Sequence, residues 1–187
     1  MMRMRSGLAW MTLVAGLLAG CGTSAVAESP PGAAPGPVVA PSAAPDVPAG
    51  AIAVTGAVRT PRTVTADQIA ALPQRTVSVQ FASGKGTEQH AEAGVLLTDL
   101  LPVDSLATTS AKNDQLSFAV VAVGSDGYRA LVSYGEAAPD FGNRGLLVST
   151  SEDGAPLARP RLVVPGDGKG GRYVSDLVRL EVIRAAG

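Results

Sequence analysis

The chain has 187 residues, with 15 basic and 16 acidic side chains, one histidine and one cysteine. A single cysteine excludes an internal disulfide, and one histidine with one cysteine excludes a zinc or copper site of the usual His/Cys kind. The absence of a strong positive charge argues against nucleic acid as the main partner.

Residues 1–20 have the layout of a bacterial signal peptide. Arg3 and Arg5 precede an apolar run of about a dozen residues, shorter than the roughly 20 that a membrane-spanning helix needs, so cleavage is expected. The string Leu18-Ala19-Gly20-Cys21 resembles the lipobox of bacterial lipoproteins. That resemblance implies lipidation of Cys21 and cleavage before it. The alternative is an ordinary signal peptide with an incidental cysteine.

Residues 21–50 are expected to be the lipidated cysteine followed by a tether. The segment is rich in Pro, Ala and Gly, which cannot bury enough apolar surface to fold. Residues 1–20 contain two arginines and no acid, so residues 21–187 carry 13 basic and 16 acidic side chains, a formal net charge of −3. The expected location is the bacterial cell membrane, with the protein lipid-anchored and facing the periplasm or the cell exterior.

Residues 51–187 are predicted to form one domain whose first half is a strand, a short helix and a hairpin. A strand is expected over 51–58, then a helix over 66–72 with Thr65 as its N-cap, stopped by Pro73. Alternating residues 74–82 predict a strand that returns over 88–92 after a turn at 83–86. Residues 95–101 are expected to form one and a half turns of helix.

The second half is predicted to be mostly strands. The nearly continuous apolar run 115–123 predicts a buried central strand, paired with a strand over 128–133. Further strands are expected over 146–149, 161–164 and 177–184, separated by glycine-containing turns. The predicted fold is α+β, a β-rich mixed-sheet domain with short connecting helices.

Two groups of residues are candidates for ligand binding. In residues 166–171, successive glycines could direct backbone N–H groups at an anion, and Lys169 and Arg172 flank them. The alternative is a glycine-rich hairpin with solvated charges. His90 is either a binding residue or a polar side chain on an exposed strand face.

Several strings in order resemble the oxidoreductase molybdopterin-binding domain of the sulfite oxidase type. They are Ile52-Ala53-Val54-Thr55-Gly56, Gly94-Val95-Leu96-Leu97, Asp126-Gly127-Tyr128-Arg129, Val163-Val164-Pro165-Gly166 and Gly171-Arg172-Tyr173-Val174. The resemblance implies that fold for residues 51–184. It also implies a phosphate-facing role for Arg172, Gly170 and Gly171, with Lys169 beside them and with His90 and Arg129 on the pocket wall.

Two departures from the family pattern bear on activity. The family's metal-binding cysteine falls in the strand that here reads Val79-Gln80-Phe81-Ala82, so Phe81 stands at the ligand position and no thiolate is available. Ser175 and Asp176 follow where larger relatives have lysine and tryptophan. We therefore expect no metal-thiolate catalysis and no bound cofactor, while the resemblance leaves open a molybdopterin, a pterin-like ligand or another small anion. The alternatives are an active molybdopterin oxidoreductase without the cysteine ligand and a lipoprotein that binds an envelope protein.

Overall fold

A computed structural model describes residues 47–185 of the chain. The predicted signal peptide, Cys21 and nearly all of the predicted tether lie outside the described residues. Among the residues described, no helix has the length and apolar character needed to cross a membrane.

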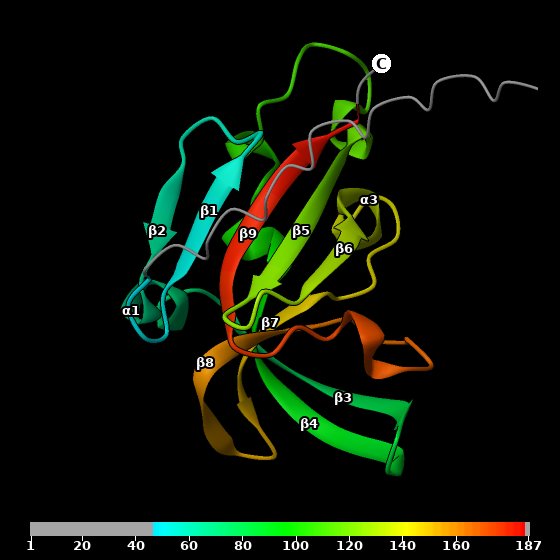
Figure 1. The fold of residues 1–187 in the computed structure, drawn as a ribbon. Helices are drawn as coiled ribbons and strands as arrows, with labels where there is room; N and C mark the ends of the chain where they lie inside the picture. The colour runs from blue at the N-terminus through cyan, green and yellow to red at the C-terminus, as the bar shows by residue number, and fades with distance from the viewer. Residues whose placement is uncertain (1–46, 186–187) are drawn as a thin grey trace, which may run out of the picture. The chain divides into compact units, whose positions relative to one another are not determined.

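Five strands form the first sheet, in the order β2-β1-β9-β5-β6 (Figure 1). Their bounds are β1 (Ile52–Gly56), β2 (Arg62–Val64), β5 (Phe118–Gly124), β6 (Arg129–Ser133) and β9 (Leu177–Arg184). β1 and β9 run parallel, and all other neighbours are antiparallel, so the sheet is mixed.

Four antiparallel strands form the second sheet, in the order β3-β4-β7-β8. Their bounds are β3 (Gln74–Ser83), β4 (Gly86–Leu96), β7 (Leu147–Glu152) and β8 (Ala155–Val163). β3 and β4 pair along their full length as a hairpin, and Figure 1 shows the tip of this hairpin projecting away from the rest of the domain.

The two sheets share one hydrophobic core. Phe118 and Leu180 from the first sheet belong to the same buried cluster as Val148 and Leu162 from the second. Each of these side chains is at most 1% exposed. Burying such a side chain contributes about 1.5–3 kcal/mol, so this core is the main force holding the sheets together.

Short helices occupy the connections. α1 (Ala66–Ala70) has Thr65 as its N-cap in a capping box with Gln68, as the sequence predicted for the cap. α2 (Leu97–Leu100) follows β4, and α3 (Tyr134–Ala137) follows β6 with a second capping box from Ser133. Three 3-10 turns complete the set, at Val103–Ser105, Asp114–Ser117 and Gly170–Arg172.

The predicted α+β class, β-rich with mixed sheets and short helices, is confirmed, but three predicted elements were wrong in extent. Val95 and Leu96 belong to β4 and not to a helix over 95–101, because they pair with Val148 and Leu147 of β7. The strand predicted from residue 115 begins at Phe118, after a 3-10 turn. β8 begins at Ala155, six residues before the predicted start.

Candidate functional site

A polar cavity of about 350 Å³ lies where the β3–β4 hairpin faces the loop between β8 and β9. Its walls come from four parts of the chain. The hairpin supplies Phe81, Lys85, Glu88 and His90, β7 and β8 supply Glu152 and Arg161, and the loop supplies Gly170, Tyr173 and Ser175.

Strand geometry explains why acidic and basic groups gather here. Side chains two residues apart on a strand point to the same face, so Glu88, His90 and Glu92 of β4 share one face. The loop is attached to the hairpin by a backbone hydrogen bond of 2.9 Å from the Ala82 N–H to the Gly168 carbonyl. The predicted residues His90 and Gly170 are thereby brought to one cavity, although 80 positions separate them in the sequence.

His90 is held between two carboxylates. Its Nδ1 lies 2.8 Å from Oδ2 of Asp153, and its Nε2 lies 3.5 Å from Oε2 of Glu88. The backbone N–H of Ala91 donates to the other oxygen of Asp153 at 2.8 Å, which fixes that carboxylate in place. The hydrogen bond to Asp153, followed by that to Glu88, raises the pKa of His90 above its ordinary 6.5.

Glu92 and Glu152 share one guanidinium nitrogen. The two glutamates face each other across β4 and β7, and Nη1 of Arg161 donates to both, at 3.2 Å to Oε1 of Glu92. Glu92 is fully buried, and its Oε2 has no hydrogen-bond partner among the described residues. Burial is the largest cause of the raised pKa of Glu92, and the charge of Glu152 adds to it.

An aromatic pair forms the wall beside these charges. The ring centroids of Phe81 and Tyr173 are 4.7 Å apart with the planes inclined by 58°. Gly170 lies directly against this pair, since an added Cβ would come within 3.0 Å of the Phe81 ring. The Tyr173 hydroxyl is buried without a partner in the described part of the chain, and burial raises the pKa of Tyr173 to about 12.

Arg172, the main predicted anion-binding residue, is bound by two carboxylates. Its Nε and Nη2 donate to both oxygens of Asp167 at 2.8 and 2.6 Å, and its Nη1 donates to Glu136 at 3.2 and 3.3 Å. The bond to Asp167 is the largest cause of the raised pKa of Arg172. Arg144 contacts the same two acids, so the four side chains form a closed ring of ion pairs that joins the loop to α3.

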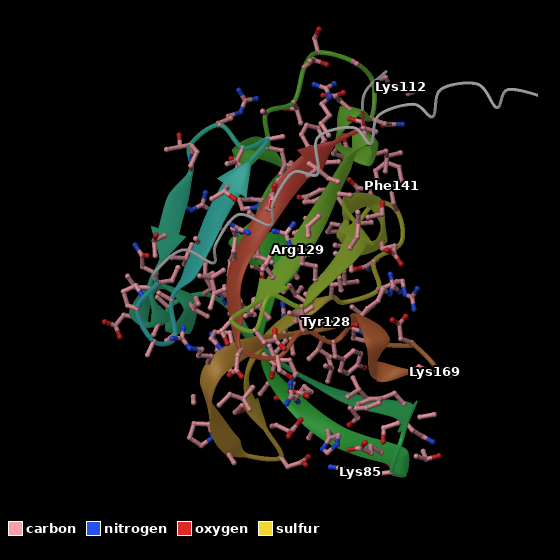
Figure 2. The ribbon with its side chains drawn as sticks, in the orientation of Figure 1. Lys85, Lys112, Tyr128, Arg129, Phe141 and Lys169 are labelled. Carbon is pink, nitrogen blue, oxygen red and sulfur yellow. The ribbon has the colours of Figure 1, made fainter. Side chains whose placement is uncertain are left out.

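The remaining predicted site residues, Lys169, Gly171 and Arg129, do not line the polar cavity. Lys169 is exposed in the loop, and Gly171 accepts a hydrogen bond of 2.5 Å from the hydroxyl of Tyr128 through its carbonyl. Arg129 is exposed at the start of β6 and does not line the cavity. In Figure 2, Lys85 marks the hairpin tip and Lys169 the loop, while Arg129 lies over the five-stranded sheet.

Sequence reasoning did not select most of the residues that define this site. Glu92, Glu152, Arg161 and Tyr173 were not named as candidates. One pattern pointed to Glu92: ionisable side chains at positions 88, 90 and 92 of a predicted strand must share one face. Glu152 of β7 and Arg161 of β8 could not be found without the register of the sheet.

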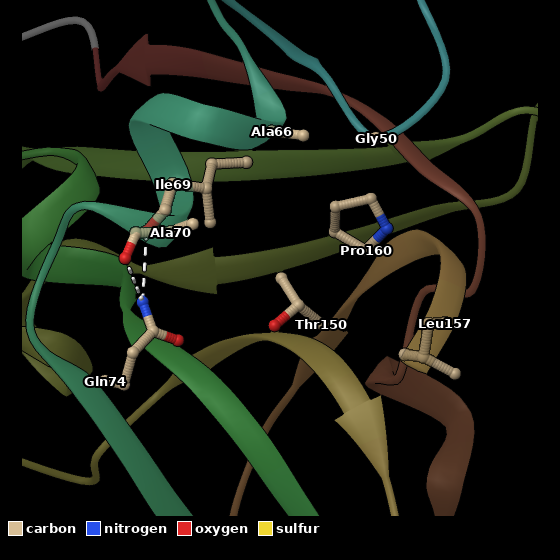
Figure 3. A pocket seen from close by; sticks show the side chains of 8 residues that line it. All are labelled: Gly50, Ala66, Ile69, Ala70, Gln74, Thr150, Leu157 and Pro160. Carbon is tan, nitrogen blue, oxygen red and sulfur yellow. Dashed lines mark hydrogen bonds between the residues drawn. The ribbon is translucent and has the colours of Figure 1, made fainter. Parts of the chain in front are cut away.

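A second cavity, of about 380 Å³, is mostly apolar (Figure 3). It lies between α1 and the β7–β8 strands and is lined by Gly50, Ala66, Ile69, Ala70, Gln74, Thr150, Leu157 and Pro160. The Gln74 amide, a polar group at its edge, donates to one carbonyl in the last turn of α1, Ile69 at 3.1 Å, and to one just after the helix, Leu72 at 2.9 Å. None of its lining side chains is charged, so we place the candidate site in the polar cavity. Over residues 47–185, no three His, Cys, Asp or Glu side chains are grouped so as to hold a metal ion.

Among the comparisons with known proteins, only the one with solved structures finds a similar fold. No family model matches the chain, and no curated protein matches it. The architecture, a mixed five-stranded sheet packed on a four-stranded antiparallel sheet, occurs among solved structures.

One such structure is the sulfane dehydrogenase SoxCD from Paracoccus pantotrophus. The two folds superimpose with a TM-score of 0.57 and 17% sequence identity, over 71% of this chain and 37% of that chain. The matched region is thus well under half of the solved chain. At this identity the likeness establishes a shared fold.

Proposed function

We propose that this protein is a membrane-anchored extracytoplasmic lipoprotein whose domain has the molybdopterin-binding fold of the sulfite oxidase type, performs no metal-thiolate catalysis and binds a small molecule in the polar cavity. The shared fold with a sulfane dehydrogenase supports the fold type. The order of the sequence motifs supports it independently.

The environment of Phe81 is the observation that carries the proposal. This residue stands where the family has its metal-binding cysteine, and it is part of the cavity wall. Its ring packs against Tyr173, and Gly170 leaves only enough room for that ring. A benzyl side chain offers no electron pair for a metal, so the position serves apolar contact and not ligation.

The phosphate of a pterin cofactor does not fit the present arrangement of charges. The N–H groups of the Arg172 guanidinium are occupied on two edges, one by Asp167 and the other by Glu136. A phosphate at this position would have to displace a carboxylate that belongs to the same loop, and it would meet the negative charge of Asp167. The residues therefore do not fit an intact molybdopterin, and we derive no reaction step through one.

Metal analysis tests this proposal. The full chain is produced in a host that makes molybdopterin, purified from membranes and analysed for molybdenum and for released pterin. We expect background amounts of both. Stoichiometric molybdenum with turnover of an oxidisable or reducible compound would instead establish the alternative, an active oxidoreductase without the cysteine ligand.

A Phe81→Cys variant sharpens this test. If only the missing thiolate prevents cofactor binding, the variant gains molybdenum when the wild type has none. If the Arg172 ion pairs also prevent it, as we propose, the variant remains free of molybdenum. Circular dichroism and thermal unfolding of the variant control for its fold.

Lipid on Cys21 would hold the domain at the membrane, and an envelope protein is a second candidate partner. The observation that favours such a partner is apolar exposure on the face of the five-stranded sheet opposite the core, where Leu131 is 51% and Ile183 is 37% exposed. Under this alternative, Leu131→Asp abolishes the function while Arg172→Ala leaves it unchanged. Under our proposal Leu131→Asp leaves ligand binding in the polar cavity unchanged, because Leu131 does not line that cavity.

A further inference from the structure

We infer that the free edge of β3 pairs with the same edge of a second copy of this chain. The two four-stranded sheets would then form one continuous sheet across a two-fold axis at Ser78. This inference goes beyond the proposed function, because it concerns the backbone edge of a strand and not the ligand of the polar cavity.

β3 is the least protected edge of the two sheets. Their edge strands are β2, β6, β3 and β8 (Figure 1). β2 has three residues, β6 has five, and β8 contains Pro156 and Pro160. Short strands and prolines are common means by which a sheet avoids pairing with another chain. β3 has ten residues, contains no proline, glycine or lysine, and pairs with β4 without a register shift. Among the described strands, β3 is therefore the edge best suited to accept another strand.

The pairing of the hairpin determines which backbone groups of β3 point outward. Ser83 pairs with Gly86 across a two-residue turn, so every second residue back from Ser83 turns its N–H and C=O groups toward β4. The residues between them turn these groups away from β4. Ala82 is one of these, and its N–H indeed donates outside the hairpin, to the Gly168 carbonyl at 2.9 Å.

The open part of this edge is short and central. Thr76, Ser78 and Gln80 have outward backbone groups by the same alternation, and all three are exposed. Their backbone groups make no hydrogen bond to another described residue. The loop at Gly168 covers one end of the edge, and the Gln74 side chain binds the end of α1 at the other. The open stretch is therefore centred on Ser78.

The sequence of the open stretch is complementary to itself when a second copy is turned antiparallel. With Ser78 opposite its equivalent in the second copy, Thr76 lies opposite Gln80 of that copy. Val77 lies opposite Val79 in the same way. The polar pairs share one face of the strand and the apolar pairs share the other, where both valines pack in a hydrophobic cluster. Like side chains thus meet like side chains across the axis, which stabilises strand pairing.

Backbone bonds and charge are compatible with the same pairing. Opposed residues whose groups face each other in an antiparallel pair exchange two hydrogen bonds, so the Ser78 pair and the two Thr76–Gln80 pairs would form about six. Arg75 is the one charged residue of β3. Its equivalent in the second copy would lie about 20 Å away, at the other end of the paired stretch. No two like charges on β3 therefore face each other across the axis.

Hydrogen exchange of the full chain in detergent, with micelles in excess over protein, tests the inference. The contact is small, so we expect a weak dimer whose population rises with concentration. The amides of Thr76, Ser78 and Gln80 should exchange at least about tenfold more slowly at about 1 mM than at about 50 μM. Val77 and Val79 face β4 in both states, and their rates should change much less. Sedimentation of the same samples measures the dimer.

Charge substitutions at Ser78 locate the axis. Ser78→Lys places two positive charges opposite each other and Ser78→Asp two negative ones, so each variant alone should dimerise at least about tenfold more weakly than the wild type. An equal mixture of the two should regain the dimer, because opposite charges then face each other. Ser110→Lys adds the same charge to an exposed loop outside both sheets and should leave dimerisation unchanged. Circular dichroism controls for the fold of each variant.

Four results overturn the inference. The first is a wild-type protein that sediments as a monomer up to about 1 mM. The second is a dimer that Ser78→Lys leaves intact, and the third is a mixture of the two folded variants that does not regain the dimer. The fourth is slow exchange at Thr76, Ser78 and Gln80 in a monomer, which would assign the edge to a strand from elsewhere. The molybdenum content of the protein bears on the proposed function alone.

Discussion

Two arginines that the sequence placed near one ligand have very different surroundings. Arg172 makes four hydrogen bonds to carboxylates and ties the glycine-rich loop to α3. Arg129, on β6, is exposed. The role of each arginine thus depends on which acidic side chains the fold places beside it. Arg129→Ala can therefore serve as the control for Arg172→Ala.

We predict that Arg172→Ala lowers the free energy of unfolding by about 1–2 kcal/mol, because it removes one of the two arginines that Asp167 and Glu136 share and leaves only Arg144. The estimate is modest since the Arg172 side chain is 32% exposed and solvent screens the pairs. Urea denaturation measures the change. Arg129→Ala, the control, should remain within about 0.5 kcal/mol of the wild type. Equal losses in the two variants would show that the ring of ion pairs adds nothing to stability.

His90 makes the stability of the domain depend on pH. Its pKa is raised in the folded state, chiefly by Asp153, so the folded protein holds the proton more tightly than the unfolded chain does. The stabilisation is complete below the unfolded value of about 6.5 and is lost as pH rises through the higher folded value.

We therefore predict that the stability difference between the wild type and His90→Gln shrinks from about pH 6 to about pH 9. Urea midpoints at several pH values measure it. Asp153 and Glu88 have lowered pKa values, the first mainly through the Ala91 N–H and the second mainly through Ser83, so both stay ionised across this window. A difference that is constant with pH would mean that His90 does not gain a proton on folding.

At the level of elements, a β-bulge at Thr150 of β7 sets how β7 pairs with β4 of the hairpin. The register of β4 against β7 shifts between Ala93 and Gly94. Gly94 lies so close to β7 that an added Cβ would come within 2.1 Å of the Val148 carbonyl oxygen and 2.7 Å of the Ser149 Cα. Only glycine permits this approach of two backbones.

We predict that Gly94→Ala destabilises the domain by about 2–4 kcal/mol, because backbone atoms of β7 cannot move aside as a flexible side chain could. Thermal unfolding measures the loss. Gly84→Ala in the hairpin turn is the control, since nothing lies within 4 Å of a Cβ there and its φ is not in the left-handed region. If Gly94→Ala unfolds at the wild-type temperature, the close approach is not a constraint on the fold.

The same elements show how far single-sequence reasoning reaches. Periodicity predicted the cores of β1, β3, β5, β6 and β9, because each alternates or is continuously apolar over several residues. β8 was predicted too short because Pro156 and Pro160 interrupt it. β8 is an edge strand of its sheet, where proline is tolerated. Val95 and Leu96 are apolar in a helix or a strand, and only the pairing with β7 decided between the two.

The candidate site was harder to predict than the strands. His90 and Gly170 were predicted from the sequence as binding residues. The ion pairs that determine the charge of the site, however, join positions far apart in the chain. Glu92 and Arg161 are 69 positions apart, and Glu136 and Arg172 are 36 apart. Such contacts depend on sheet register and loop path. No local pattern indicates that the guanidinium group of Arg172 is neutralised by an acid from α3.

At the scale of the whole molecule, we expect the stability of the described domain to be independent of the predicted lipid anchor. The core is formed by residues of both sheets between positions 52 and 182. Cys21 precedes that core by about thirty residues of proline-rich chain, which lies outside the described residues. Stability and location should therefore respond to different mutations.

We predict that Cys21→Ser moves the protein from the membrane fraction to the soluble fraction of a bacterial host without changing the unfolding temperature of the domain. Several acyl chains would bury many methylene groups at about 0.8 kcal/mol each, which gives an effectively permanent anchor, and serine cannot accept them by the thiol route. Cell fractionation after growth with labelled palmitate measures how much of the protein carries lipid and sediments with the membrane. Calorimetry measures the unfolding temperature of the domain. Ser24→Ala, three residues further on, is the control and should remain lipidated. A Cys21→Ser protein that still sediments with membranes would mean that an uncleaved apolar segment, and not lipid, holds it there.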